Sequence, residues 1–362
     1  MPLDEPSWWY SGGDDWRARA LQPIARVYGW GAMRRFAKAK PYRADRPVIC
    51  VGNFTAGGTG KTPLSLLLAE MLKEVGKSPV FLTRGYTGNL TGPVWVDPGI
   101  HDARDVGDEP MLLAAVAPTM ISRDRAAGAK AITSRIPPTS VIIMDDGLQN
   151  PALHKDLTLA VVDGHRGIGN GELIPAGPLR APLSFQFSMT DAIIVNCPLA
   201  TGGTDEASTG GAKRESGILT RLRESFSGPV LAATPEPAGD ITWLRDTPVI
   251  AFAGIANPQR FFRLLESLGA ELVTTLAYRD HHRFTSAEMA DLLARAKASG
   301  AQLVTTEKDL ARLDEEGETV SARLRQATRS LPIRLAFNGN DLMRLQALIA
   351  TLFTGSQDQR TP

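Results

Sequence analysis

The residues best suited to chemistry lie between Thr55 and Thr62. The segment NFTAGGTGKT separates the apolar run Val48 to Gly52 from a stretch with helical spacing. Glycines here let backbone N–H groups face phosphate oxygens, while a lysine reaches the β- and γ-phosphates and a hydroxyl ligates Mg²⁺. We predict a nucleoside triphosphate-binding loop in which Lys61 contacts phosphate and Thr62 the metal, although the strict pattern has glycine where Thr55 stands. The predicted loop comprises Thr55, Ala56, Gly57, Gly58, Thr59, Gly60, Lys61 and Thr62.

Two consecutive carboxylates form the next candidate. Asp145 and Asp146 end the apolar run that begins at Val141. A carboxylate at a strand end near a phosphate-binding loop is the usual partner of Mg²⁺. An Asp-Gly pair is also a turn signal, so on local grounds both interpretations are open. The phosphate-binding loop favours the first, and we predict Thr62, Asp145 and Asp146 as the metal ligands.

Asp108 lies in the sequence GDEP, directly before a predicted helix. It could cap that helix, or it could accept the proton of an attacking hydroxyl group. His281, in the sequence DHH, has no cysteine or histidine partner at a zinc-binding spacing. A histidine beside a carboxylate can instead take part in proton transfer.

A long loop rich in glycine and proline, GNGELIPAGPLR, runs from Gly169 to Arg180. Long loops at the carboxyl edge of a parallel sheet often contact substrates. Arg180 could bind an anion there or simply be exposed. The sequence TTEKD, from Thr305 to Asp309, indicates only the start of another helix.

These candidates follow short, continuous runs of Val, Ile and Leu that alternate with helical stretches. That pattern predicts a doubly wound, mainly parallel α/β sheet covered on both faces, as in P-loop NTPases. We divide the 362-residue chain into a P-loop kinase core and a second, smaller α/β domain. The predicted boundaries are 1–46 for an N-terminal amphipathic segment, 47–200 for the core, 201–216 for a flexible Gly/Ser/Thr-rich linker, 217–354 for the second domain and 355–362 for a disordered tail.

The N-terminal segment contains a predicted helix from Ala20 to Lys38. Between Arg17 and Arg46 there are nine Lys or Arg residues and one acid, Asp45, with aromatic residues interspersed. Such a helix could lie at a membrane surface, or it could pack on the domain with a solvated basic face. The residues alone slightly favour packing on the domain.

Composition limits the remaining possibilities. A formal net charge of +1 argues against a protein that binds polyanions over its whole surface, and we expect no nucleic-acid partner. Cys50 and Cys197 lie in apolar runs, which predicts buried thiols rather than a disulfide or metal site. No apolar run is long enough to span a bilayer, and the first residues do not form a secretory signal. We therefore expect the protein to stay in the cytoplasm, where it could still bind a membrane surface.

Nine segments, in order, resemble the tetraacyldisaccharide 4′-kinases, the lipid A 4′-kinases of Gram-negative bacteria. The resemblance extends from about Val48 to Leu313 and is specific because of the order of its motifs. It implies an ATP-dependent kinase that phosphorylates the 4′-hydroxyl of a tetraacylated glucosamine disaccharide 1-phosphate to give lipid IVA. It also implies a peripheral or monotopic enzyme on the cytoplasmic face of the bacterial inner membrane, and it shifts the interpretation of the N-terminal helix toward membrane contact. The segments are VGNFTAGGTGKTPL, TRGY, GDEP, DDGLQ, VVDG, GNGELIPAGPLR, FAGIANPQRFF, YRDHHRF and TTEKD.

The resemblance also implies roles for individual residues. Lys61 would bind phosphate, Asp108 would be the catalytic base and His281 would support it. The metal-binding threonine and acidic pair of the family match Thr62, Asp145 and Asp146, and the arginine of its PAGPLR segment matches Arg180. This chain has Ala181 where the family usually has a carboxylate, so no role of that carboxylate can be transferred. It also has Thr83, Thr87 and Asn150 where the family usually has serine, glycine and histidine.

Two other functions are compatible with the motifs. One is a P-loop kinase for a soluble sugar or nucleoside, which would not need the first 40 or so residues. The other is a P-loop binding protein whose ATP hydrolysis drives assembly or membrane partitioning, without a phosphorylated acceptor. For the predicted lipid kinase we expect ATP and Mg²⁺, an acylated disaccharide substrate, a membrane surface and no obligate protein partner.

Overall fold

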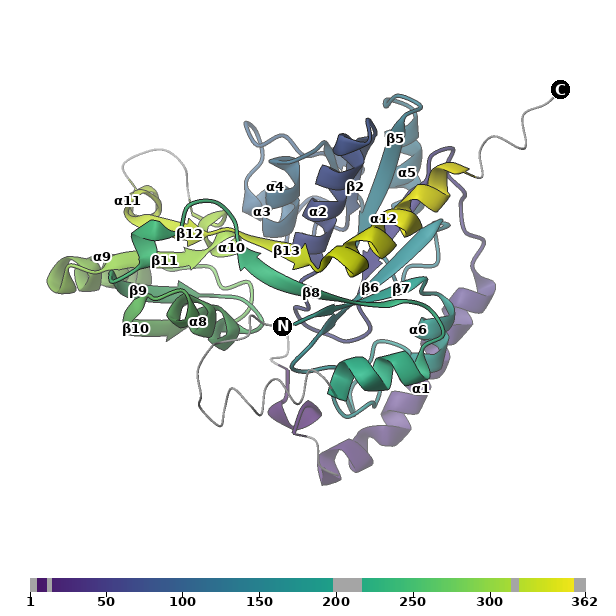
Figure 1. The fold of residues 1–362 in the computed structure, drawn as a ribbon, viewed down its shortest axis with the longest axis horizontal. Helices are drawn as coiled ribbons and strands as arrows, with labels where there is room; N and C mark the ends of the chain where they lie inside the picture. Colours follow the sequence, from purple (N-terminus) through teal and green to yellow (C-terminus); the bar gives the residue numbers. More distant parts are fainter. Residues whose placement is uncertain (1–4, 12–14, 198–216, 314–318, 355–362) are drawn as a thin grey trace.

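The computed structural model describes residues 5–11, 15–197, 217–313 and 319–354. Its centre is a nine-stranded sheet in the order β13-β8-β7-β6-β1-β5-β2-β4-β3 (Figure 1). All neighbouring strands are parallel except the edge pairs β13–β8 and β3–β4. The strands are β1 (Val48–Gly52), β2 (Ser78–Thr83), β3 (Val94–Trp95), β4 (Thr119–Ile121), β5 (Ser140–Asp145), β6 (Leu157–Asp163), β7 (Ala192–Asn196), β8 (Val230–Pro237) and β13 (Ile333–Phe337).

Helices cover both faces of this sheet, as the continuous apolar strands predicted. On β6, Leu159 and Val161 belong to one hydrophobic cluster and Ala160 to another, because successive side chains point to opposite faces. The helices α2 (Lys61–Glu74), α4 (Asp108–Ala114) and α12 (Gly339–Thr354) pack on the first face. The helices α5 (Arg125–Thr133), α6 (Leu183–Ser188) and residues 217–225 pack on the second, and α3 (Ala103–Val106) precedes α4.

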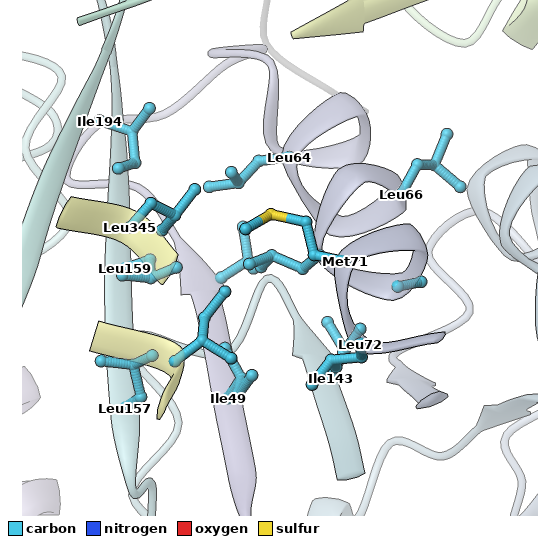
Figure 2. Close-up of a cluster of buried hydrophobic side chains, with 14 of the residues drawn as sticks. Ile49, Leu64, Leu66, Met71, Leu72, Ile143, Leu157, Leu159, Ile194 and Leu345 are labelled. Carbon is cyan, nitrogen blue, oxygen red and sulfur yellow. The ribbon is translucent and has the colours of Figure 1, made fainter. Parts of the chain in front are cut away.

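The helix α2 buries one side against the first face of the sheet. Figure 2 shows Leu72 of α2 next to Ile143 of the sheet, and Leu64 of α2 near Leu345 of α12. Burial of each such side chain is worth about 1.5–3 kcal/mol. This packing fixes the start of α2, and with it the loop between β1 and α2.

A smaller four-stranded parallel sheet has the order β10-β9-β11-β12. On the left of Figure 1, it lies beside the larger sheet with its own two hydrophobic clusters, one under α8 and one under α9 and α11. Its elements are β9 (Pro248–Ala253), α8 (Pro258–Ser267), β10 (Glu271–Ala277), α9 (Ser286–Ser299), β11 (Gln302–Thr306), α10 (Glu307–Leu310), α11 (Val320–Ala327) and β12 (Thr328–Leu331), preceded by the short helix η2 (Thr242–Leu244).

The sheet topology differs from the expected division at residue 217. The strands β8 and β13 lie within the expected second domain, but both pair into the nine-stranded sheet. The smaller sheet therefore spans 248–331 and is inserted between two strands of the larger one. The pairing of β13 with β8 joins strands that are far apart in the sequence and leaves no local signal. The limits of the smaller domain therefore could not be placed from composition. The predicted linker 201–216 and tail 355–362 lie outside the described residues.

The N-terminal helix α1 (Trp16–Lys38) begins four residues before the predicted start. The Asp15 side chain accepts a hydrogen bond from Arg17 N and caps the helix. Ala25 and Gly29 face inward, and Phe36 makes an edge-to-face contact with Phe185 of α6 at 5.1 Å between ring centroids. No helix among the described residues is long and apolar enough to cross a membrane.

The side of α1 that faces away from the protein carries large apolar side chains together with basic ones. Large hydrophobic side chains are exposed there, including Ile24 at 58%, Val27 at 68% and Trp30 at 61%. Eleven large hydrophobic residues are exposed in the described chain, and six of them lie on this helix. Exposed apolar side chains are therefore concentrated on α1 rather than scattered over the surface. The full set on α1 is Trp16, Ile24, Val27, Tyr28, Trp30 and Met33.

Cys50 and Cys197 do not form a disulfide with each other, and the prediction of buried thiols holds fully only for Cys50. Cys50 is fully buried in β1, whereas Cys197, directly after β7, is only half-buried.

Candidate active site

The predicted phosphate-binding loop connects β1 to α2 at the carboxyl edge of the large sheet. Gly57 and Gly60 have φ angles of 87° and 94°, in the left-handed region that favours glycine. The Asn53 side chain donates to Gly57 O at 3.1 Å, and the Asn196 side chain donates to Thr59 O at 3.0 Å. The loop is therefore held in its turns by side chains from the ends of two strands.

The loop from Gly169 to Arg180 lies against the phosphate-binding loop. Ala56 N donates to Pro178 O at 2.8 Å, and Arg180 N donates to Phe54 O at 2.9 Å. The helix α1 reaches the same loop through Gln22, which donates to Glu172 at 3.1 Å. A continuous set of contacts thus connects α1, this loop and the phosphate-binding loop.

Lys61 and Arg180 meet at one carboxylate. Asp146 Oδ1 lies 3.6 Å from Lys61 Nζ and accepts a 2.9 Å hydrogen bond from Arg180 Nη1. Burial alone would raise the pKa of Asp146, but the charges of Lys61 and Arg180 outweigh it and lower that pKa. The structure thus brings together three predicted site residues that are far apart in the sequence.

Asp145 has a different environment. Its Oδ1 accepts a hydrogen bond from Ser65 Oγ at 2.9 Å, while its Oδ2 is buried without a hydrogen-bond partner. Burial, and then the charge of Glu109, raise the pKa of Asp145 to about 6. A buried carboxylate oxygen without a partner is costly unless a ligand satisfies it.

These side chains fit a magnesium ion. Mg²⁺ prefers hard oxygen ligands and is usually bound through one or two carboxylates together with substrate phosphates. Asp145 supplies a free carboxylate oxygen, and Thr62 lies buried in the first turn of α2. Within the described ranges no group of three or more His, Cys, Asp or Glu side chains could hold a metal.

Asp108 is not the N-cap of its helix. The cap position of α4 is Gly107, and Asp108 is the first helical residue, with a side chain that is only 2% exposed. Its Oδ1 lies 3.2 Å from His281 Nδ1. Its Oδ2 accepts hydrogen bonds from Arg312 Nε at 3.1 Å and Nη2 at 2.5 Å. Of the two local interpretations, the structure excludes the cap.

His281 and Arg312 shift the pKa of Asp108. Burial would raise the pKa of Asp108, but His281 and Arg312 lower it well below the usual range of a carboxyl group. Burial would lower the pKa of His281, but its hydrogen bond to Asp108 and the charge of Asp108 raise it. The pair is therefore stabilised as a carboxylate and an imidazolium.

Glu109 connects the Asp108 cluster with the phosphate-binding loop. Its side chain pairs with Lys308 at 2.5 Å across the two sheets. Burial would raise the pKa of Glu109, but the charge of Lys308, together with that of Lys61, lowers it. The Asp108 and Asp145 groups therefore belong to one electrostatic system.

Local sequence reasoning gave no role to several residues that join the two sheets. Arg260, on α8, donates to Asp163 at 3.0 Å and to Asn196 at 2.7 Å, at the ends of β6 and β7. Arg312 and Lys308 follow β11 and reach α4. Arg260 lies in the motif FAGIANPQRFF and Lys308 in the motif TTEKD. The motifs therefore drew attention to both residues, but their contact partners could not be predicted because they are remote in sequence.

Sequence reasoning also gave no role to Glu5, near the N-terminus. Its Oε2 accepts hydrogen bonds from Tyr10 Oη at 3.0 Å and Arg166 Nη1 at 2.9 Å. Its Oε1 lies so close to Gly57 that a Cβ atom on that glycine would be only 1.7 Å away. A carboxylate from the N-terminal segment thus lies directly on the phosphate-binding loop.

Comparison with known proteins agrees with this architecture. A family model described as tetraacyldisaccharide-1-P 4′-kinase, LpxK, matches residues 17–352. The chain belongs to this family. The tetraacyldisaccharide 4′-kinase of a Bradyrhizobium species is 44% identical over 361 residues, covering 99% of this chain and 98% of that protein. The enzyme of Methylobacterium nodulans is 45% identical over 356 residues, covering 98% of each.

A solved structure extends the agreement to three dimensions. The crystal structure of LpxK from Aquifex aeolicus in complex with ATP superposes with a TM-score of 0.69 at 25% identity, covering 93% of this chain and 99% of that one. Membership of the LpxK family confirms the predicted family, the mainly parallel α/β fold with an N-terminal helix, and the enzyme class, an ATP-dependent kinase. The match also extends beyond the motifs, because it includes α1 and α12.

Proposed function

We propose that this protein transfers the γ-phosphate of ATP to the 4′-hydroxyl of tetraacyldisaccharide 1-phosphate, forming lipid IVA during lipid A biosynthesis. The observation that carries the proposal is the match of the LpxK family over residues 17–352, nearly the whole chain. A kinase for a soluble sugar or nucleoside would not be expected to share this full-length similarity with lipid kinases.

In the proposed mechanism, the backbone of Thr55–Thr62 and the Lys61 ammonium hold the ATP phosphates. Lys61 now lies 3.6 Å from Asp146 and would exchange that contact for phosphate. Thr62, Asp145 and Asp146 would hold Mg²⁺, which when bound neutralises negative charge on the phosphate oxygens. Arg180, beside Asp146, provides a further positive charge at the same edge. Such catalysis consists mainly of positioning and charge stabilisation.

Asp108 is the proposed base that accepts the proton of the acceptor hydroxyl, and His281 fixes its orientation. In the structure both Asp108 oxygens are hydrogen-bonded and almost fully buried. An acceptor hydroxyl can therefore reach Asp108 only after the smaller sheet moves away from α4. Closure after substrate binding would then exclude water from the reacting groups.

The proposed location is the cytoplasmic face of the bacterial inner membrane. The exposed apolar residues of α1, with nearby arginines such as Arg34 and Arg35, suit the boundary between acyl chains and anionic headgroups. Since the acyl chains of the substrate cannot leave the bilayer at low cost, an enzyme that binds beside them is favoured. The contacts from α1 to the phosphate-binding loop would then hold the site next to the membrane.

A phosphotransfer assay tests the proposal. Detergent-solubilised protein would be incubated with γ-labelled ATP, Mg²⁺ and tetraacyldisaccharide 1-phosphate, with Lys61→Ala as the control. Labelled lipid that disappears in the control is the expected result. Protein that binds ATP but labels no lipid would overturn the acceptor assignment and direct the search to soluble sugars or to hydrolysis without an acceptor.

A further inference from the structure

Arg312 makes directed contacts with every nitrogen of its guanidinium group. Nε and Nη2 donate to Asp108 Oδ2, and Nη1 donates to Asp309 Oδ1 at 2.5 Å and to Gly254 O at 2.8 Å. The side chain is only 7% exposed. A planar guanidinium held at three acceptors has one orientation available, unlike a flexible lysine ammonium.

The smaller sheet provides a rigid support for this arginine. Asp309 is fully buried, and both its oxygens accept from Gly254 N at 3.1 Å. Its Oδ2 also accepts from Thr306 Oγ1 at 2.6 Å. Asp309 is thus fixed between the ends of β9 and β11, and it fixes Arg312 in turn.

The same support holds His281. Gly254 O accepts from His281 N at 3.0 Å as well as from Arg312 Nη1. His281 then contacts one oxygen of Asp108 and Arg312 contacts the other. One backbone carbonyl therefore connects two side chains that bind Asp108 from both sides.

We propose that Arg312 is a positioning residue for phosphotransfer, which together with His281 forms a two-point clamp that orients the Asp108 carboxylate when the two sheets come together. The inference rests on the proposed function, because it takes Asp108 as the group that meets the acceptor hydroxyl. It assigns the segment after TTEKD a role in catalysis that local reasoning could not provide.

An arginine beside a base makes that base weaker, so its advantage must lie in orientation. Phosphoryl transfer passes through a loose transition state with little covalent work for the protein, and positioning dominates. A misplacement of about 1 Å can cost about a hundredfold in rate. The groups that act electrostatically on Asp108 are His281 and Arg312 in direct contact, and Lys308, Glu109 and Asp309 nearby. Asp280 lies beside His281.

The test compares Arg312→Gln and Arg312→Lys with the parent. Arg334→Lys is a matched control, because Arg334 pairs with Glu70 and Glu307 and does not contact Asp108. For Arg312→Gln we expect kcat to fall about a hundredfold, the KM for ATP to stay within about twofold, and the acidic limb of the kcat–pH profile to move to higher pH. Arg312→Lys should recover part of kcat, since it restores charge but not geometry.

Unchanged kcat and an unchanged pH profile in Arg312→Gln would overturn the inference. A loss of ATP binding in parallel with kcat would also overturn it, since that indicates general damage. A parent that labels no lipid would contradict the proposed function instead, and a second readout then tests the clamp without turnover. In an NMR titration the His281 pKa should rise in Arg312→Gln, because a neighbouring positive charge is lost, and an unchanged value would refute the clamp.

Discussion

The carboxylate of Asp108 and the imidazole of His281 lie 3.2 Å apart across the junction between the two sheets. Asp108 begins α4 on the large sheet, and His281 follows β10 of the small one, 173 residues away. The left-handed φ of 57° at His281 turns the chain at this point. A pair built this way exists only while the two sheets are together, so the Asp108–His281 contact depends on how the sheets are arranged.

Replacing Asp108 by Asn tests the role of this carboxylate as a base. Asn keeps the shape but cannot accept the proton, so turnover should fall about 10²–10⁴-fold. ATP affinity should change little, because no phosphate-binding group is removed. Steady-state phosphotransfer and ATP titration of the same preparation would check both. Near-normal turnover would leave Asp108 with a structural role only.

The Asp108–His281 pair should also make stability depend on pH. The pKa of His281 is raised above 6.5 in the folded protein, so the pair stabilises the fold fully below pH 6.5. This contribution is lost as pH rises through the folded pKa, where the imidazole loses its proton. The difference in melting temperature between the parent and His281→Gln should therefore be largest below pH 6.5 and shrink above it. Packing lost in His281→Gln lowers the melting temperature by an amount that does not depend on pH. A melting-temperature difference that grows with pH would contradict the ion pair.

The phosphate-binding loop could be predicted from sequence because its chemistry is local. The residues from Thr55 to Thr62 are contiguous and are framed by a strand and a helix. The parallel sheet followed from similarly short patterns, such as the apolar run that ends at Asp145, and the metal site expected at the end of that run stays a prediction. Contiguous turns and runs of this kind are set mainly by near neighbours in the chain.

The clamp and the sheet edges could not be predicted, because they depend on distant partners. Arg312 meets Asp108 over 204 residues, and nothing near Arg312 in the sequence distinguishes it from a solvated arginine. Similarly, β8 resembles a strand of the second domain until its pairing with β7 is known. Glu5 contacts Arg166, which is 161 residues away, and no sequence motif around Glu5 indicates that it lies on the phosphate-binding loop.

The exposed apolar side chains of α1 should determine membrane binding. Changing Ile24, Val27 and Trp30 to Ser removes three exposed apolar side chains, each worth about 1.5–3 kcal/mol when fully buried. Partitioning onto anionic phospholipid vesicles should then fall on the order of a hundredfold or more. Vesicle co-sedimentation measures this directly, and Ile100→Ser is the control, since Ile100 is 76% exposed on a distant loop. Equal loss in the control, or no loss in the triple variant, would refute this role of α1.

Glu5 should oppose nucleotide binding. Its carboxylate lies against Gly57, and Arg166 and Tyr10 hold it there, on the loop that would receive the phosphates. ATP must either displace this negative charge or bind beside it, at a cost of about 1 kcal/mol. Glu5→Gln should therefore bind ATP about fivefold more tightly in calorimetry. Glu266→Gln, an exposed change on α8, should leave the affinity unaltered. Weaker binding by Glu5→Gln would mean that the carboxylate assists the nucleotide, for example through its metal ion, and that the repulsion argument is wrong.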